Sequence, residues 1–440
     1  MKQMLGSEYD AFEACMHGRH LKGIRINTLK YSVQNADRLG LPIRSCPFSE
    51  SGFYLESDEP GIGNSPWHHA GAFYSQEPSA MSAVTVLDPQ PGEKVLDLCA
   101  APGGKSTQIA ALLQGKGLLW SNEYVRRRAQ ILLSNVERMG IRNCVVSSAH
   151  PDRLGEGLAG FFDRVLVDAP CSGEGMFRRD PQAVADWSPE HSAACAVRQL
   201  AILDSAAKCL REGGVLVYST CTFSFRENED VITAFLDSHP EFSLEDSGVA
   251  FGRTGYDRSE KYDLTLTRRI FPMDGGEGHF AARLRKNGDS SGTEFFDSRN
   301  DKKRDEEKRA YELFGECFRT EPYGEIRRIG DSLYILPERM PEVKGMGILR
   351  GGVLLGESMK NRIEPSHALF MAAQAEECRS AVSLNPDSRE LAAFLHGEEI
   401  PIDGSLKGYA AVACGGTVTG FGKCSGGRLK NRYPKGLRTL

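Results

Sequence analysis

The chain has 440 residues, of which 40% are hydrophobic and 26% charged, and its formal net charge is −5. This length exceeds what one hydrophobic core usually serves, so we expect roughly two to four domains. The net negative charge excludes a general electrostatic attraction to nucleic acid, so any such binding must come from local basic faces.

The twelve cysteines contain no C-x-x-C pair, which argues against a metal site and against a disulfide framework. The N-terminus has no apolar segment of signal-peptide length, and no run approaches the roughly 18 apolar residues of a membrane span. We therefore expect a cytoplasmic protein without a metal and without a membrane partner.

Residues 1–72 combine an expected N-terminal helix with the extended segments GIRINTLK and SGFYLES, followed by the Gly- and Pro-containing stretch EPGIGNSPWHH. This mixture predicts a small α+β domain and a connector.

Residues 73–285 alternate between strand-like and helix-like segments. The expected strands are KVLDLC, GLLWSNE, CVVSS, DRVLVD and VLVYST. Such short apolar runs are typical of strands buried on both faces. Repeated strand–helix units predict an α/β domain with a doubly wound, mostly parallel sheet, whose ligands bind at the carboxyl ends of the strands.

Two helices of this region have recognisable ends. One begins near residue 125 and stops at Gly140, and its apolar stripe comprises Val125, Ala129, Leu132, Leu133, Val136 and Met139. The other precedes VLVYST, with Ser188 as N-cap, Pro189 as first residue and Gly213–Gly214 as terminator.

Residues 286–310 are polar, charged and non-periodic, which predicts a flexible linker or an exposed insertion. Its segment DKKRDEEKR alternates in sign and is expected to be solvated. Residues 311–365 indicate a small β-rich domain, and residues 366–440 a second one with a helix near SRELAAFLHG and short strands in GYAAVACGGTVTGFGK.

The final residues, from Gly415 to Leu440, contain six Lys or Arg and no acidic residue. Such a tail can neutralise phosphates, and we expect Phe421 and Tyr433 to offer stacking faces to bases. The alternative is a merely solvated basic surface.

The segment DLCAAPGGKST, residues 97–107, ends like a phosphate-binding loop. However, Cys99 stands where such a loop needs its first glycine, which disfavours a P-loop phosphotransferase. Glu123 follows the next strand and is placed to accept hydrogen bonds from a ribose diol. The small residues of the loop would let a nucleoside cofactor approach the backbone. The alternative is a glycine-rich helix start beside an exposed glutamate.

Two cysteines follow expected strands. Asp168 and Cys171 come after DRVLVD, and Cys221 comes after VLVYST. Strand ends meet at one rim of a parallel sheet, so both thiols should lie near the loop from Cys99 to Gly104. Most cysteines only pack in the core, but these two have no apolar neighbours in sequence.

Two thiols at such a rim suit methylation of carbon 5 of a pyrimidine. A thiolate that adds to carbon 6 makes carbon 5 nucleophilic, and a base or a second thiol then helps to release the product. Asp168 is placed to contact ring nitrogen 3, and Lys105 can stabilise a thiolate or contact the base. The target base must leave its stack, which favours single-stranded or distorted RNA.

Four segments resemble the motifs of the Sun/Nop2 RNA cytosine carbon-5 methyltransferases: VLDLCAAPGGKSTQIA, the NE of Glu123, FDRVLVDAPCSGEGMFRRDP and GGVLVYSTCTFSFRENE. The tail GFGKCSGGRLKNRYPKGLR resembles the C-terminal RNA-binding piece of the RsmF branch, which acts on small-subunit (16S) ribosomal RNA. The resemblance implies a Rossmann-like class I methyltransferase core that uses S-adenosyl-L-methionine, with a last domain that is PUA-like.

The same resemblance implies roles for individual residues. Cys221 would be the nucleophile, and Cys171 the thiol that assists product release, with Asp168 and Lys105 completing the catalytic set. The cofactor-binding residues would be Cys99, Ala100, Ala101, Pro102, Gly103, Gly104, Lys105, Glu123 and Asp168.

One position departs from the family pattern. Many members have an aspartate after the third strand that holds the adenine amino group, whereas this chain has His150 there and Asp152 two residues later. The adenine contact therefore stays open between His150, Asp152 and the backbone.

The partner that the resemblance implies is RNA, either small-subunit ribosomal RNA or an assembling ribosomal subunit, gripped by the two terminal domains. We expect no DNA partner, and nothing demands more than a monomer. Transfer RNA as substrate, and a non-catalytic RNA-binding assembly factor, remain as alternatives.

Overall fold

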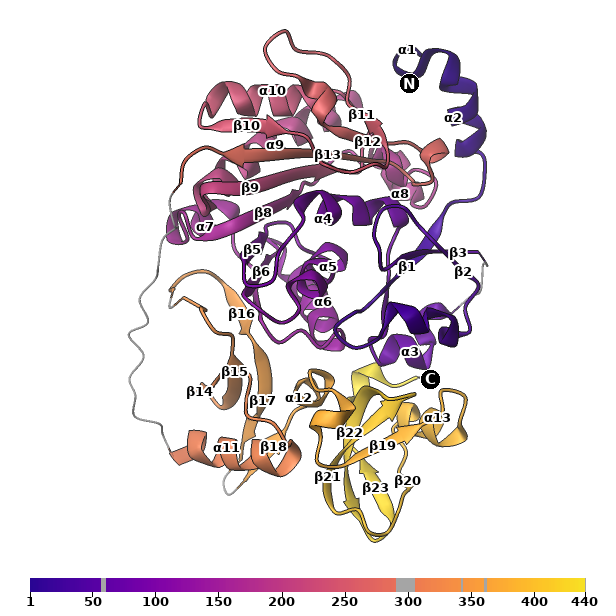
Figure 1. Cartoon of the computed structure of the whole chain (residues 1–440), viewed down its shortest axis with the longest axis vertical. Helices are drawn as coiled ribbons and strands as arrows, with labels where there is room; N and C mark the ends of the chain where they lie inside the picture. Colours follow the sequence, from indigo (N-terminus) through magenta and orange to yellow (C-terminus); the bar gives the residue numbers. More distant parts are fainter. Residues whose placement is uncertain (57–60, 290–304, 342, 360–361, 440) are drawn as a thin grey trace.

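The structure is a computed structural model that describes residues 1–440 except 57–60, 290–304, 342, 360–361 and 440. Its described residues form four β-sheets, and a strand from the C-terminal half, β16 Ile348–Gly351, joins the largest of them (Figure 1). No helix of the described part is long and apolar enough to cross a lipid bilayer.

The N-terminal region begins with two helices and continues into an antiparallel sheet of order β2-β3-β1-β4. Its last strand, β4, lies beyond the boundary expected at residue 72. The elements are α1 Lys2–Leu5, α2 Tyr9–Met16, β1 Lys22–Ile26, β2 Ile43–Ser45, β3 Gly52–Leu55, α3 Pro66–His69 and β4 Phe73–Ser75.

The central region confirms the Rossmann-like α/β class. Its sheet has the order β11-β12-β13-β9-β8-β5-β6-β7-β16, with β10 paired to β13. The five strands from β7 to β9 are parallel, and β13 is antiparallel to β9. The strands are β5 Lys94–Asp97, β6 Leu118–Asn122, β7 Cys144–Ser147, β8 Phe162–Asp168, β9 Leu210–Thr220, β10 Phe242–Glu245, β11 Arg253–Thr254, β12 Arg268–Ile270 and β13 His279–Lys286.

Helices cover both faces of this sheet, and each face has its own apolar core. One core takes residues from α7, α9 and α10, and the other from α4, α5 and α6. The chain runs outward from β5 in both directions, so the switch point lies between β5 and β8, where ligands of such sheets bind. The helices are α4 Ser82–Leu87, α5 Gly104–Leu113, α6 Arg126–Arg138, α7 Pro151–Gly157, α8 Pro181–Asp186, α9 Pro189–Cys209 and α10 Glu229–Ser238.

Helix α6 confirms most of the expected apolar stripe. Ala129, Leu132, Val136 and Met139 are buried, but Val125 is 46% exposed because it precedes the helix as its N-cap. Gly140 follows the helix with φ 71°, a conformation that glycine adopts without steric cost. Its stop signal was therefore predicted correctly.

Helix α9 begins as expected and ends earlier than expected. The Ser188 hydroxyl accepts a hydrogen bond from the His191 backbone amide, with Pro189 as first residue. Gly213–Gly214 do not terminate the helix: Leu210 already pairs with Phe162 of β8, and the next paired residue of β9 is Val215. The two glycines therefore lie in a bulge of β9, and the prediction of a glycine stop was wrong.

The next region contains a four-stranded antiparallel sheet of order β14-β15-β17-β18. One of its neighbours in sequence, β16, instead pairs with β7 and extends the central sheet. The expected linker 286–310 falls mostly on residues outside the described ones, and its end, from Asp305, is helical. The elements are α11 Asp305–Cys317, β14 Glu325–Ile329, β15 Ser332–Leu336, β16 Ile348–Gly351, β17 Val353–Ser358, β18 Ile363–Pro365 and α12 His367–Met371.

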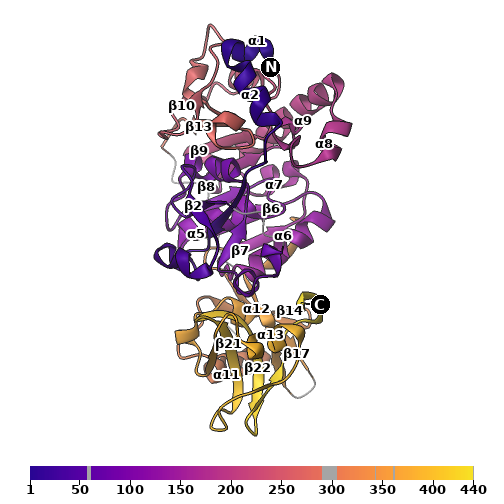
Figure 2. The same cartoon turned by 90° about the vertical axis from the view of Figure 1, so that its right-hand side faces the viewer.

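The last region has a five-stranded sheet of order β19-β21-β22-β23-β20, and the C-terminal strands form a lobe below the central region (Figure 2). It shares an apolar core with the N-terminal sheet, in which Trp67 and Phe73 accompany Phe394 and Tyr433. The elements are β19 Ala381–Leu384, α13 Arg389–His396, β20 Ile400–Pro401, β21 Gly408–Cys414, β22 Thr417–Ser425 and β23 Arg428–Asn431.

The expected stacking faces of the basic tail are not available. Phe421 and Tyr433 are each 3% exposed. Phe421 stacks on Phe370, and the Tyr433 hydroxyl lies 2.8 Å from Nδ1 of His69. These rings hold the lobe together, so the prediction that they stack on bases was wrong, and any binding by the tail must rely on its charges.

Candidate active site

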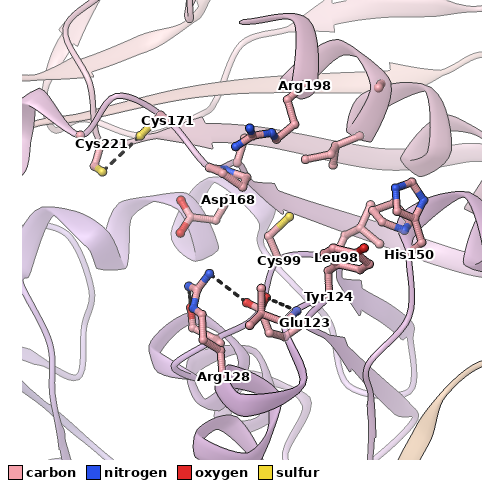
Figure 3. A pocket seen from close by; sticks show the side chains of 18 of the residues that line it. Leu98, Cys99, Glu123, Tyr124, Arg128, His150, Asp168, Cys171, Arg198 and Cys221 are labelled. Atoms are coloured by element: carbon pink, nitrogen blue, oxygen red, sulfur yellow. Dashed lines mark hydrogen bonds and ion pairs between the residues drawn. The ribbon is translucent and has the colours of Figure 1, made fainter. Parts of the chain in front are cut away.

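A cavity of about 720 Å³ opens at the carboxyl ends of β5, β6, β8 and β9, the place expected from the strand order. Its lining joins the loop after β5, Glu123 after β6, the segment from Asp168 to Cys171 after β8, and Cys221 after β9. Helix α9 closes another side with Arg198, Ala201 and Ile202. In the view of Figure 3 the two sulfurs lie at one end, with Asp168 between them and Glu123.

The loop after β5 supplies only part of the cavity wall. Cys99 and Ala101 line the cavity, together with Glu123 and Asp168. The other expected cofactor residues do not line it: Ala100, Pro102, Gly103, Gly104 and Lys105. Ala100, Pro102 and Gly103 belong to the turn before α5, with Gly103 at φ 118°, and Gly104 and Lys105 begin the helix.

An N-terminal arginine braces this turn from behind. The buried Arg25 guanidinium donates hydrogen bonds to the Thr107 hydroxyl at 2.6 Å and to the Gly104 carbonyl at 3.3 Å. Burial lowers the pKa of Arg25 to about 9, still well above neutrality. The α+β region is therefore joined to the first turn of α5, directly after the loop that supplies Cys99 and Ala101 to the cavity wall. No local sequence pattern predicts this contact.

Glu123 is held in place for hydrogen bonding. Its Oε1 accepts a hydrogen bond from the Val125 amide at 2.9 Å, and its Oε2 lies 3.3 Å from the Arg128 guanidinium. Arg128 also donates to the Ala101 carbonyl, linking α6 to the loop after β5. A carboxylate has about four acceptor positions, so Glu123 keeps capacity for a ligand diol.

Cys171 and Cys221 face each other. Their sulfurs are 3.3 Å apart, within hydrogen-bonding range for two thiol groups, and both side chains are half-buried at the rim (Figure 3). The hydrogen bond to Cys221 and burial together raise the pKa of Cys171 well above its ordinary value. Cys171 is therefore the thiol that stays protonated and can donate to the other sulfur.

Lys105 and Asp168 form an ion pair beside the thiols. Their Nζ and Oδ2 atoms are 2.8 Å apart, and the Ser219 hydroxyl donates to Asp168 Oδ1 at 2.9 Å. Burial would raise the pKa of Asp168, but the positive charge of Lys105 holds it below its ordinary value. Burial likewise opposes the charge of Lys105, yet Asp168 raises the pKa of Lys105. Asp168 is thus a carboxylate, able to accept hydrogen bonds but not to act as an acid.

His150 and Asp152, the two candidates for an adenine contact, differ in position. His150 lines the cavity, and its ring packs edge-on against Tyr124 at a centroid distance of 5.4 Å. Asp152 lies in α7, accepts a hydrogen bond from the Ser205 hydroxyl at 2.7 Å and does not line the cavity. The geometry therefore favours His150 over Asp152.

Several residues near the cavity belong to no sequence motif and follow no expected strand end, so they could not be predicted. Arg198 and Ile202 reach it from the middle of α9, and His279 of β13 lies 3.9 Å from Asp168. Burial lowers the pKa of His279 to about 3, so this histidine is neutral. Only Arg128 and Tyr124 had a usable signal, since they follow Glu123 closely in sequence.

The cavity fits the nucleoside cofactor implied by the sequence motifs. Glu123 offers acceptors for a ribose diol, and Tyr124 and His150 offer flat surfaces for a base. The exposed Arg198 guanidinium suits the carboxylate of an amino-acid moiety. Among the described residues, no cluster of His, Cys, Asp and Glu could hold a metal ion.

Comparison with known proteins gives the family. Residues 84–285 match the model of the 16S rRNA methyltransferases RsmB/F, and residues 1–78 match the RsmF N-terminal domain. Residues 313–372 match the first RsmF C-terminal domain, and residues 381–439 match the RsmF PUA domain.

Individual relatives agree with these matches. The ribosomal RNA small subunit methyltransferase F of Aeromonas hydrophila is 33% identical over 97% of this chain and 93% of its own. The corresponding protein of Vibrio vulnificus is 34% identical over 94% of this chain and 91% of its own. A methyltransferase homolog of Pyrococcus horikoshii, solved by crystallography, is similar to 65% of this chain and 92% of its own, with 30% identity and a TM-score of 0.57. The chain belongs to the RsmF branch of the 16S ribosomal RNA methyltransferase family.

Proposed function

We propose that this protein methylates carbon 5 of a cytosine in small-subunit ribosomal RNA, with S-adenosyl-L-methionine as methyl donor. The observation that carries the proposal is the pair of sulfurs 3.3 Å apart at the rim of the cavity. RNA binding alone needs neither thiol, whereas carbon-5 methylation uses one thiol as nucleophile and can use a second to release the product. Membership of the family supports the substrate class.

When bound, S-adenosyl-L-methionine supplies an electrophilic methyl group from its sulfonium. Glu123 would hold the ribose, and the backbone at Cys99 and Ala101 together with Arg198 would hold the rest. His150 would contact the adenine. Each of these roles is a proposal that rests on the position of the residue around the cavity.

The chain's own groups account for the remaining chemistry. The Cys221 thiolate adds to carbon 6 of the cytosine, and the ring electrons move toward carbon 5. The Lys105 ammonium stabilises the negative charge that develops on the ring, and the Asp168 carboxylate accepts a hydrogen bond from the amino group of the cytosine. After methyl transfer, a water molecule takes the proton from carbon 5, the electrons of that C–H bond re-form the double bond between carbons 5 and 6, and Cys221 leaves as a thiolate. Cys171 assists by donating a hydrogen bond to the departing sulfur.

RNA contacts would come from the two terminal regions, residues 1–72 and 366–440. Lys423, Lys430 and Lys435 are exposed on the last region, and such ammonium groups bind phosphates without reading sequence. We propose that the protein works as a monomer in the cytoplasm on RNA rather than on DNA.

Methyl transfer to defined RNAs tests the proposal. Purified protein with labelled S-adenosyl-L-methionine should modify small-subunit ribosomal RNA, free or in subunits, at a cytosine that bisulfite sequencing identifies. Methyl transfer only to transfer RNA would support the proposed reaction but assign it a different substrate. Absence of transfer to any cytosine-containing RNA, with RNA binding retained, would favour the non-catalytic assembly factor.

A further inference from the structure

Glu227 and Asn228 lie just beyond Cys221, between β9 and α10, and neither side chain is exposed to solvent. The Glu227 carboxylate is the acceptor of three hydrogen bonds, from the Ser172 amide, the Gln199 amide group and the Ser192 hydroxyl. Three donors therefore surround this one buried carboxylate. Burying a carboxylate costs free energy, so we expect Glu227 to have a specific role next to the two thiols.

Glu227 fixes the loop that carries Cys171. The Ser172 amide donates to Glu227 Oε2 at 2.9 Å, and Ser172 directly follows Cys171. Gln199 of α9 donates to the same oxygen at 3.0 Å and also to the Pro170 carbonyl, directly before Cys171, at 3.0 Å. Both neighbours of Cys171 in the chain are thereby tied to one carboxylate.

Asn228 fixes the segment that carries Cys221. Its Oδ1 accepts a hydrogen bond from the Thr220 hydroxyl at 2.6 Å, and its Nδ2 donates to the Thr222 carbonyl at 2.9 Å. Thr220 and Thr222 flank Cys221, so Asn228 is bonded to the residues on both sides of that thiol. Glu227 is bonded directly to the residue after Cys171 and, through Gln199, to the residue before it.

We propose that Glu227 is a positioning residue that holds Cys171 against Cys221 and makes the two sulfurs electrostatically unequal. This inference rests on the proposed function of the thiol pair. The carboxylate lies on the Cys171 side, whereas the ammonium of Lys105 acts on Cys221. Negative charge disfavours a thiolate and positive charge favours it. The arrangement thus favours the protonated form of Cys171.

The charges around Cys171 agree with this assignment. Glu227 is the carboxylate that contributes to the raised pKa of Cys171, after the hydrogen bond to Cys221 and burial. Two other titratable side chains lie near the thiol pair: Tyr218, whose hydroxyl donates to the Glu227 carbonyl at 2.6 Å, and Glu174, whose carboxylate accepts hydrogen bonds from the Thr222 hydroxyl and the Phe223 amide on the Cys221 side. Burial raises the pKa of Tyr218 well above its ordinary value, so this phenol stays neutral. Lys105 is neutralised in part by Asp168.

Thiol alkylation measured by peptide mass spectrometry tests the proposal without any RNA. In the unmodified protein at neutral pH, Cys221 should react faster than Cys171 by about tenfold or more, because the raised pKa of Cys171 leaves little of the reactive thiolate there. In Glu227→Gln the loss of a nearby negative charge should lower the pH midpoint of Cys171 alkylation by about one unit. An unchanged midpoint in a folded variant, or faster reaction of Cys171 in the unmodified protein, would overturn the proposal.

The matched control is Glu229→Gln. Glu229 is also buried, but its carboxylate pairs with Arg269, which donates to the Phe223 carbonyl. This control should lower thermal stability and leave the Cys171 midpoint in place. If it moved the midpoint as much as Glu227→Gln, general loosening rather than the charge of Glu227 would be responsible. Should Glu227→Gln fail to fold, faster alkylation of Cys171 than of Cys221 in the unmodified protein would still overturn the proposal.

Kinetics separate positioning from binding. Glu227→Gln should lower kcat about 100-fold, as a misplacement of reacting groups by about 1 Å does, and leave KM for S-adenosyl-L-methionine within about twofold. A rise in KM with unchanged kcat would contradict a positioning role. Alkylation as expected in a protein that methylates no cytosine would reject the proposed function while leaving the placement of Glu227 intact.

Discussion

The ammonium of Lys105 lies 2.8 Å from the carboxylate of Asp168. The lysine belongs to the first turn of α5 and the aspartate ends β8, so the pair joins the cofactor loop to the segment that carries Cys171. It also sets the charge at the rim, because each partner shifts the pKa of the other toward the charged form. Positive charge is thereby kept next to a site where negative charge develops.

Replacing Lys105 by Met should remove most methyl transfer, by about 100-fold or more, because the charge on the reacting ring loses its stabilisation. Lys105→Arg, which keeps the charge, should recover part of it. The unfolding free energy should fall by about 1–3 kcal/mol, a value discounted because the Asp168 side chain is 30% exposed.

The loss of unfolding free energy in Lys105→Met should depend on pH in a defined direction. Asp168 has a lowered pKa, so its contribution is present above the ordinary carboxyl value of about 4 and is lost as pH falls further. Lys105 has a raised pKa, so its contribution is lost only above about pH 10. The unfolding free energies of Lys105→Met and of the unmodified protein, measured with urea, should differ by a constant amount from about pH 5 to 9. A difference that vanished at neutral pH would contradict the ion pair.

Asp97 should destabilise the protein at neutral and alkaline pH. Burial raises its pKa to about 7, so between about pH 4 and 7 the folded state binds more protons than the unfolded state, and stability falls as pH rises. Asp97→Asn removes this dependence. Its unfolding free energy, relative to the unmodified protein, should rise by about 2–4 kcal/mol across that window. A difference that does not change with pH would contradict the raised pKa.

The exposed lysines of the last region should account for salt-dependent RNA binding. Changing Lys423, Lys430 and Lys435 together to Gln should reduce the slope of log affinity against log salt by about 2, since each phosphate contact to a single strand contributes about 0.7. Filter binding with a small-subunit RNA fragment measures this slope. Phe421→Leu is the control and should lower stability without changing the slope. An unchanged slope in the triple variant would place the RNA elsewhere.

Part of the fold and of the site could be predicted because it depends on local rules. Buried parallel strands have a recognisable composition, and residues that follow them must meet at one edge of the sheet, as Asp168, Cys171 and Cys221 do. The start of α9 was predictable because Ser188 and Pro189 satisfy backbone groups within a single turn.

Other features depend on contacts between distant segments. Pairing of β16 with β7 joins residues of different regions, and the burial of Phe421 against Phe370 is decided by packing, which composition cannot reveal. The bulge at Gly213–Gly214 exists because β9 must align with β8. Arg198 and Glu227 likewise acquire their positions only when α9 and the segment after β9 pack against the thiols.

Covalent attachment to RNA tests the central claim most directly. The unmodified protein, Cys221→Ser and Cys171→Ser are each incubated with small-subunit RNA and S-adenosyl-L-methionine, and covalent complexes are resolved on a denaturing gel. If Cys221 attacks the base and Cys171 assists release, Cys221→Ser forms no complex and transfers no methyl group, while Cys171→Ser accumulates the complex. A covalent complex formed by Cys221→Ser, or methyl transfer by Cys221→Ser, would contradict the account.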